Sequence, residues 1–361
     1  MRKVKRIGLM LLFLLVLITA CQQASEAEQE QEQAEKEKED LKAEQIEEVP
    51  IEVKSEGAFF HLDDLINVTG GQYIFDELHR TLQLTIHEDR FYMVDEVPVL
   101  ERNGEYLATK DIYFTIDDQQ NVYLPTAFIE QGLNIPVTYG EDVAKIAWLG
   151  PSEAVGGPPT SFNFDQWTVD QMVEHLEFLE KPIKDAEVST VPSHLPGAPR
   201  AYRNGFHEGI DWYDFSSGGN INTDTPIYAM GEGIVVRVDH DYEEYPSPGV
   251  RNQDLAITAE LGETPEYIFD RLRGMQVWVQ YPNGVMNRFA HLDSIPDELQ
   301  VGDRVNSETI IGYVGNSGTS GAVNKDLSGL HLHQDLLIYG ELFWKPLTQA
   351  EVTEVLTRIW R

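Results

Sequence analysis

The chain has 361 residues, 42% of them hydrophobic, which is enough for about two domains with apolar cores. Its formal net charge at pH 7 is −34. Such a field repels the phosphate backbone, so we exclude nucleic-acid binding, and we read the acidity as a solubility feature or as an adaptation to a salty or alkaline exterior.

Residues 1–20 have the composition of a signal peptide. A basic start is followed by an apolar run over 7–18, which is shorter than the roughly 20 residues of an ordinary membrane-spanning helix. The stretch Ile18-Thr19-Ala20-Cys21 resembles a bacterial lipobox, and this resemblance implies cleavage before Cys21 and lipidation of its sulfur. The alternative is an uncleaved N-terminal membrane anchor. Both interpretations place the rest of the chain outside the cytoplasm, held to the bacterial membrane at its N-terminal end.

Residues 21–50 are rich in Glu, Gln, Lys and Ala and contain almost no large apolar side chains, which predicts a disordered acidic spacer. Residues 51–150 change character and predict a small α+β module. The stretch over 81–94 alternates polar and apolar residues and predicts a strand. Residues 121–150 predict a short strand, a helix that ends near Gly132, and further strands.

The segment "VYLPTAFIEQGLNIPVTYGEDVAKIAW" gives this module a diffuse resemblance to the copper-amine-oxidase N-terminal-like domain of exported bacterial proteins. The resemblance implies a stalk or a wall-contact module and no copper chemistry. The spacings of His61, His79 and His87 match no familiar metal site, so we interpret these three as surface or strand residues.

Residues 151–200 predict a linker that carries one helix, capped by Thr168 and stopped by Pro182. Residues 201–347 predict a strand-rich domain, with a tight hairpin turn at 281–284. Residues 240–274 have the look of an insertion between strands, including a helix that starts near Thr264. Residues 348–361 predict a C-terminal helix packed on the domain or on the linker.

Two histidines stand one residue apart in "SGLHLHQDL", although the chain has only 10 histidines. Side chains at positions i and i+2 of a strand point to the same face, about 7 Å apart, so His331 and His333 would look into one cavity. Taken alone, the pair also suits two half-buried or surface histidines. His207 and Asp211 upstream in "NGFHEGIDW", and His291 in "NRFAHLDSI", make a joint explanation necessary.

A catalytic zinc site needs three protein ligands and one open position, and two imidazoles with one carboxylate satisfy this. Such a site activates water and polarises a carbonyl, while two further histidines could move protons and stabilise an oxyanion. Gly205 and Gly209 beside the first motif suit a bent strand or loop that comes close to such a site.

The set "HEGID", "FAHL" and "GLHLH" resembles the LytM/lysostaphin-type zinc endopeptidases over about residues 200–347. All five signature positions are occupied. "VGDRVNSETIIGYVGNSGTS" is similar to a hairpin of that family, although Ser307 stands where glycine is usual. The resemblance implies that His207, Asp211 and His333 are the metal ligands of one Zn²⁺ per chain. It implies that His291 and His331 are catalytic residues outside the metal shell.

The resemblance also implies the fold class and the activity. We expect a mainly β chain, with an antiparallel β-sheet or barrel-sandwich peptidase domain that carries a groove, preceded by the α+β module. We expect a zinc endopeptidase that hydrolyses peptide bonds of peptidoglycan peptides at the cell surface. The alternatives are a non-catalytic lipoprotein that binds the wall or activates another hydrolase, and a zinc protease of exported proteins.

Three features depart from the family pattern or stay open. Gln334-Asp335 replaces the usual aromatic-acidic pair, and the insertion of about 35 residues is longer than the usual connection. Arg200 and Arg203 could pair with substrate carboxylates, but we favour surface solvation for both. The substrate-binding residues are unknown from the sequence, and we interpret His175 and His240 as ordinary helix and surface residues.

Overall fold

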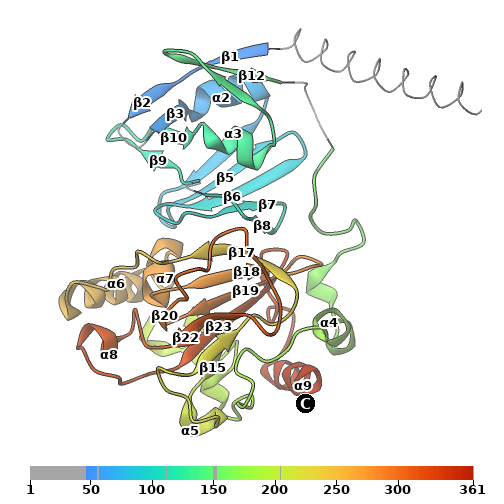
Figure 1. Cartoon of the computed structure of the whole chain (residues 1–361), viewed down its shortest axis with the longest axis vertical. Helices are drawn as coiled ribbons and strands as arrows, with labels where there is room; N and C mark the ends of the chain where they lie inside the picture. The colour runs from blue at the N-terminus through green and yellow to red at the C-terminus, as the bar shows by residue number, and fades with distance from the viewer. Residues whose placement is uncertain (1–45, 55–56, 111, 149–152, 204, 361) are drawn as a thin grey trace, which may run out of the picture.

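The computed structural model describes residues 46–54, 57–110, 112–148, 153–203 and 205–360. A smaller N-terminal module lies above a C-terminal domain with a large antiparallel sheet (Figure 1). The predicted signal peptide, the predicted lipidation site at Cys21 and nearly all of the predicted spacer lie outside these residues. In the part of the chain that is described, no helix has both the length and the apolar surface needed to cross a bilayer. The predicted fold class, mainly β with antiparallel sheets, is confirmed.

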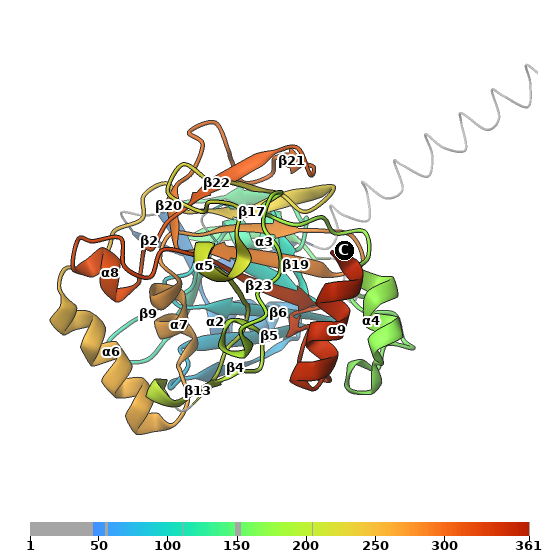
Figure 2. The ribbon, with the colours of Figure 1, turned by 90° about the horizontal axis from the view of Figure 1, so that it is seen from below.

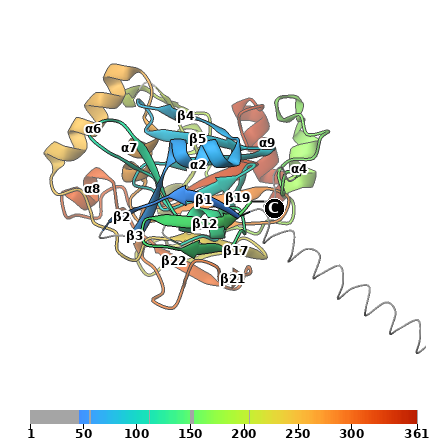
Figure 3. The ribbon, with the colours of Figure 1, turned by 90° about the horizontal axis from the view of Figure 1, so that it is seen from above.

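The N-terminal module is built from three antiparallel sheets and two short helices around one apolar core, which includes Phe60, Leu84 and Phe128. Helix α2 lies against β1 and β3 (Figure 3). The strands and helices are β1 (Ile46–Pro50), β2 (Glu52–Lys54), β3 (Gly57–His61), α2 (Leu62–Thr69), β4 (Gln72–Asp76), β5 (Thr81–Ile86), β6 (Asp89–Val94), β7 (Leu100–Arg102), β8 (Glu105–Leu107), β9 (Thr115–Ile116), β10 (Val122–Pro125), α3 (Ala127–Gly132), β11 (Val137–Tyr139) and β12 (Val143–Ala147).

Two expectations for the module need correction. The stretch over 81–94 is a hairpin of β5 and β6 instead of one strand, because His87 takes a left-handed backbone conformation (φ 54°) and turns the chain. The module also includes residues 46–50, which the sequence predicted as part of the spacer. Strand β1 pairs with β12 and buries Val49 completely in the core, so these five residues do not belong to the spacer.

The three module histidines have structural contacts. The His61 ring meets the Tyr123 ring edge-on, the His87 ring stacks on Trp148, and the His79 ring lies 3.8 Å from a carboxylate oxygen of Glu263. Among the described residues, neither of the two groups with metal-ligand spacing includes any of the three.

The linker wraps along the C-terminal domain through η1 (Phe164–Gln166), α4 (Val169–Leu176) and η2 (Pro192–His194). Thr168 caps α4 as predicted, in a reciprocal capping box with Gln171. The helix ends at Leu176, before the predicted stop at Pro182. Beyond it, Leu179 is drawn into the domain core and the Glu180 N–H donates to the Met230 carbonyl at 2.7 Å, which a continuing helix would not allow.

The C-terminal domain packs two antiparallel sheets around the largest apolar core of the described chain, and the two-helix insertion lies at one side. The large sheet has the order β15-β23-β19-β18-β17-β21 with β24 beside β23, and the small sheet has the order β16-β22-β20. The elements are β13 (Pro199–Arg200), η3 (Ala201–Arg203), β14 (Gly205–Phe206), β15 (Ile210–Trp212), α5 (Asp214–Ser217), β16 (Pro226–Tyr228), β17 (Gly233–Val238), α6 (Pro248–Leu261), α7 (Glu266–Arg273), β18 (Val277–Gln280), β19 (Val285–Ala290), β20 (Leu292–Ser294), β21 (Arg304–Val305), β22 (Ile310–Val314), α8 (Ser320–Val323), β23 (Leu332–Ile338), β24 (Glu341–Leu342) and α9 (Gln349–Ile359).

Most local expectations for this domain are confirmed. The predicted hairpin turn joins β18 to β19, with Gly284 in the left-handed region (φ 70°). The predicted insertion helix is α7, whereas the longer α6 before it was not predicted. The C-terminal helix α9 lies against the linker helix α4 (Figure 2), and the Trp360 ring after it approaches the buried Trp212 ring.

The module and the domain share a small apolar cluster of their own. Val97, Val99 and Tyr106 of the module are buried against Trp278 and Met286 of the large sheet. The Tyr106 backbone N–H donates to the Gln280 side chain at 2.9 Å, and the Arg288 guanidinium donates to the Tyr106 hydroxyl at 3.0 Å. The two parts are therefore joined by packed side chains as well as by the linker.

Candidate metal centre

Strand pairing brings the predicted ligands together. Asp211 on β15 and His333 on β23 are direct partners in the ladder of the large sheet. On and just before β23, His331, His333 and Asp335 share one face, while Leu332 and Leu336 of the opposite face are fully buried in the core. The alternation predicted from the sequence therefore holds, and it places three polar side chains on the face that carries the candidate centre.

His207 reaches the same place because its loop runs close to β23. A Cβ atom on Gly209 would lie 2.2 Å from the Gln334 carbonyl oxygen, so only glycine permits this approach. The His207 backbone N–H donates to the Ala198 carbonyl at 2.7 Å, and its ring Nδ1 lies 3.1 Å from the Leu195 carbonyl oxygen. Nδ1 thus carries the proton, which leaves the Nε2 lone pair facing the groove.

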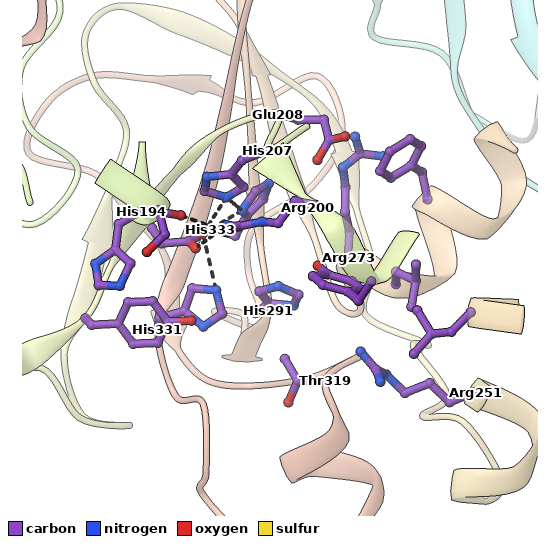
Figure 4. Close-up of a pocket in the computed structure, with 17 residues that line it drawn as sticks. His194, Arg200, His207, Glu208, Arg251, Arg273, His291, Thr319, His331 and His333 are labelled. Carbon is purple, nitrogen blue, oxygen red and sulfur yellow. Dashed lines mark hydrogen bonds and ion pairs between the residues drawn. The ribbon is translucent and has the colours of Figure 1, made fainter. Parts of the chain in front are cut away.

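Three donor atoms converge at this point (Figure 4). His207 Nε2 lies 3.0 Å from Asp211 Oδ1 and 3.3 Å from His333 Nδ1, and these two atoms are 2.8 Å apart. Tetrahedral zinc with bonds of about 2.0–2.1 Å keeps its ligand atoms about 3.3–3.4 Å apart. Two imidazoles and one carboxylate at nearly this separation fit a zinc ion with one coordination position left open to the groove.

Each of these side chains is held by a contact on its far side. His333 Nε2 lies 2.8 Å from Asp335 Oδ1, and the fully buried Asp335 accepts a hydrogen bond from Arg273 Nε at 2.8 Å. Arg200 Nη2 donates to Asp211 Oδ2 at 3.2 Å. Such outer contacts fix the orientation and the tautomer of metal ligands.

Two of the three side chains, His207 and Asp211, have the protonation state that a metal ion requires, whereas His333 does not. Burial lowers the pKa of His207, which favours the neutral ring. Burial alone would raise the pKa of Asp211, but His207 and His331 hold it well below its usual range. Burial alone would lower the pKa of His333, but the Asp335 and Asp211 carboxylates raise it to about 9, so this ring must release a proton when a metal binds.

His291 and His331 line the groove beside this triad. His291 Nδ1 lies 2.7 Å from the Ser317 carbonyl oxygen and His331 Nδ1 lies 2.6 Å from the Gly329 carbonyl oxygen, so Nδ1 is the donor in both rings. His291 has a left-handed backbone (φ 62°) between β19 and β20, which is uncommon outside glycine. Burial, together with His331 and His333, lowers the pKa of His291 well below its usual range.

A second group of side chains also has metal-ligand spacing. It consists of His291, His331 and His333, so it shares one member with the first group. The first group contains the buried Asp211, whose negative charge a cation would compensate. We therefore place the candidate metal at the group that contains the carboxylate.

Sequence reasoning missed several residues around the candidate centre. Asp335 lies two positions after His333, so the same alternation could have identified it. The Tyr213 ring stacks on the His331 ring with centroids 4.3 Å apart, and no sequence signal indicated this contact. The solvation role favoured for Arg200 is wrong, because its guanidinium contacts Asp211. The side chain of Arg203 lies outside the described residues. His175 and His240 bond to the backbone carbonyls of Asn283 and Leu299, and neither belongs to a group with metal-ligand spacing.

We expect Asp335→Asn to weaken zinc binding by about 10- to 100-fold, the usual effect of losing a contact behind a metal-bound histidine. The amide cannot supply the negative charge that orients His333. Zinc affinity is measured by competition with a chromogenic chelator, on protein shown to be folded by near-UV circular dichroism. Asp293→Asn, which changes an exposed carboxylate of the same domain, is the control. Unchanged affinity in folded Asp335→Asn would contradict the assigned contact.

Comparison with known proteins gives weak matches only. No known protein family and no curated protein matches the chain. Among solved structures, LytU shares 24% identity over 41% of this chain and 68% of its own, with a TM-score of 0.24. A mutant catalytic domain of the prophage-encoded M23 protein EnpA from Enterococcus faecalis shares 21% sequence identity over 39% of this chain and 77% of its own, with a TM-score of 0.24. Lysostaphin from Staphylococcus simulans shares 18% sequence identity over 43% of this chain and 47% of its own, also with a TM-score of 0.24. At such TM-scores the superpositions carry no argument, so the candidate site stands on its own geometry.

Proposed function

We propose that this protein is a zinc-dependent endopeptidase that hydrolyses peptide bonds of peptidoglycan at the cell surface. The observation that carries the proposal is the convergence of His207 Nε2, Asp211 Oδ1 and His333 Nδ1 beside two further histidines, His291 and His331. The peptidoglycan substrate and the surface location rest on the sequence resemblance and on the predicted lipidation of Cys21, and both belong to the proposal.

A zinc ion held by these three side chains would supply Lewis acidity to a peptide carbonyl and to water. The protein's own part is to orient those ligands through Asp335 and Arg200 and to manage protons. His291 is neutral at neutral pH because its pKa is depressed, so its Nε2 can accept a proton from water. His331 Nε2 lies 3.4 Å from Asp211 Oδ1, and a proton on it can stabilise negative charge on the carbonyl oxygen or pass to the leaving amine.

The proposal is tested with the full-length protein, zinc and purified peptidoglycan sacculi. We expect soluble fragments with new amino and carboxyl termini, identified by mass spectrometry. We also expect release to stop with a zinc chelator and to recover when zinc is added back, as a metal-dependent reaction requires.

Casein is digested in parallel. Cleavage of casein without cleavage of peptidoglycan would support the alternative of a protease for exported proteins. A zinc-loaded protein that cleaves neither would contradict the peptidase proposal and favour a non-catalytic, wall-binding role.

A further inference from the structure

The insertion supplies one wall of the groove that leads to the candidate metal centre. Arg251 and Leu255 of α6, and Phe269 and Leu272 of α7, line the same groove as the four site histidines (Figure 4). Helix α6 contacts both η3 and α8. A substrate in the groove would therefore contact residues of the insertion.

This wall is held rigidly in place. Asp254, one turn after Arg251 on α6, is buried and accepts hydrogen bonds from Arg271 Nε and Nη2 at 3.0 and 2.8 Å. The Tyr245 hydroxyl donates to the same carboxylate at 2.7 Å. Because this buried network ties α6 to α7, the side chains that α6 presents to the groove are pre-organised.

Arg251 differs in its pairing from the other two arginines that line the groove. Arg200 pairs with Asp211 and Arg273 pairs with Asp335. Arg251 Nε donates to the Gly318 carbonyl at 2.8 Å, and the Gly318 N–H is itself held by Glu244 Oε2 at 2.8 Å. Within the described ranges, no carboxylate forms an ion pair with the Arg251 guanidinium, so its terminal nitrogens are available to a ligand.

The surroundings of Arg251 add to its positive charge. It lies in the first turn of a 14-residue helix, where the backbone N–H groups and the helix dipole favour an anion, yet this turn contains no acidic residue. A chain with a net charge of −34 repels anions in general, so an unpaired cation at this place needs a local reason. An arginine fixed through Nε can still bind a carboxylate with its two terminal nitrogens.

We propose that Arg251 binds a carboxylate of the peptide substrate, on the α6 side of the metal centre. Leu255, Phe269 and Leu272 provide an apolar surface beside it, which suits an anionic group next to aliphatic side chains. This inference rests on the proposed peptidase function and gives it a substrate class, namely acidic peptides.

The test compares muropeptides from the same peptidoglycan before and after their carboxyl groups are converted to amides with carbodiimide and ammonia. We expect the wild-type protein to cleave the untreated peptides with a kcat/KM higher by about tenfold or more, the usual range for a charge-assisted hydrogen bond. In Arg251→Ala this ratio should fall to less than about twofold, and Arg251→Lys should retain part of it as a single point charge. Arg304→Ala, an exposed arginine away from the groove, should leave both rates as in the wild type.

Two pairs of synthetic peptides identify which carboxylate is bound. One pair differs only in a free or amidated C-terminus, and the other differs only in a Glu or Gln side chain. Wild-type-like discrimination in Arg251→Ala, with its zinc content and folding intact, would overturn the role of Arg251 and leave the peptidase proposal standing. A wild-type protein that cleaves no peptide would overturn both, and equal cleavage of acid and amide by the wild type would overturn the inference alone.

Discussion

Replacing His333 by alanine is expected to remove zinc from the protein and to abolish peptide hydrolysis. Contacts behind a metal ligand are worth about 10- to 100-fold in affinity, so loss of a ligand itself should weaken zinc binding by more than about 100-fold. Zinc is measured by mass spectrometry on dialysed protein and by chelator competition. His240→Ala should keep one zinc per chain, because His240 is exposed and bonds only to the Leu299 carbonyl and the Gln300 side chain.

The same zinc measurements distinguish between the two candidate metal sites that share His333. If zinc lies at the group with the carboxylate, His207→Ala should lose it as His333→Ala does, whereas His331→Ala should keep it. The opposite pattern would place the ion among His291, His331 and His333 and would require a different assignment of roles. Stoichiometric zinc in His333→Ala would contradict both groups.

Removing the His291 ring should have the second large effect, on turnover and not on zinc. A general acid or base contributes about 10²–10⁴-fold to a rate, so kcat should fall by that amount while one zinc per chain is retained. His291→Asn is the better variant, since asparagine tolerates the left-handed backbone at this position more easily than alanine does.

Paired measurements of zinc content and kcat decide this prediction. Loss of zinc from folded His291→Asn would show that His291 belongs to the metal shell. Turnover within about twofold of the wild type would exclude His291 from proton transfer, since a general base is worth far more than that. His291→Ala provides a second variant, and agreement between the two separates loss of the ring from strain in the backbone.

The sequence predictions were correct where a short local pattern of residues determines the structure. The alternation around His331 and His333 predicted their common face, the hairpin turn before β19 was found from its Pro-Asn-Gly sequence, and Thr168 was recognised as a helix cap. The expectations failed where distant contacts decide. Helix α4 ends early because residues after it pack into the domain, and β1 forms because β12 is available to pair with it.

The candidate site likewise depends partly on local sequence patterns and partly on tertiary contacts. The sequence by itself determined which side chains could hold a metal, because residue type and spacing on one strand are local properties. Only the tertiary structure decided which ring nitrogens face the metal point, that Asp335 and Arg200 support the ligands, and that α6 brings Arg251 to the groove. Those outcomes depend on strand pairing and on burial between segments far apart in the chain, and no local pattern of residues encodes the distances across such contacts.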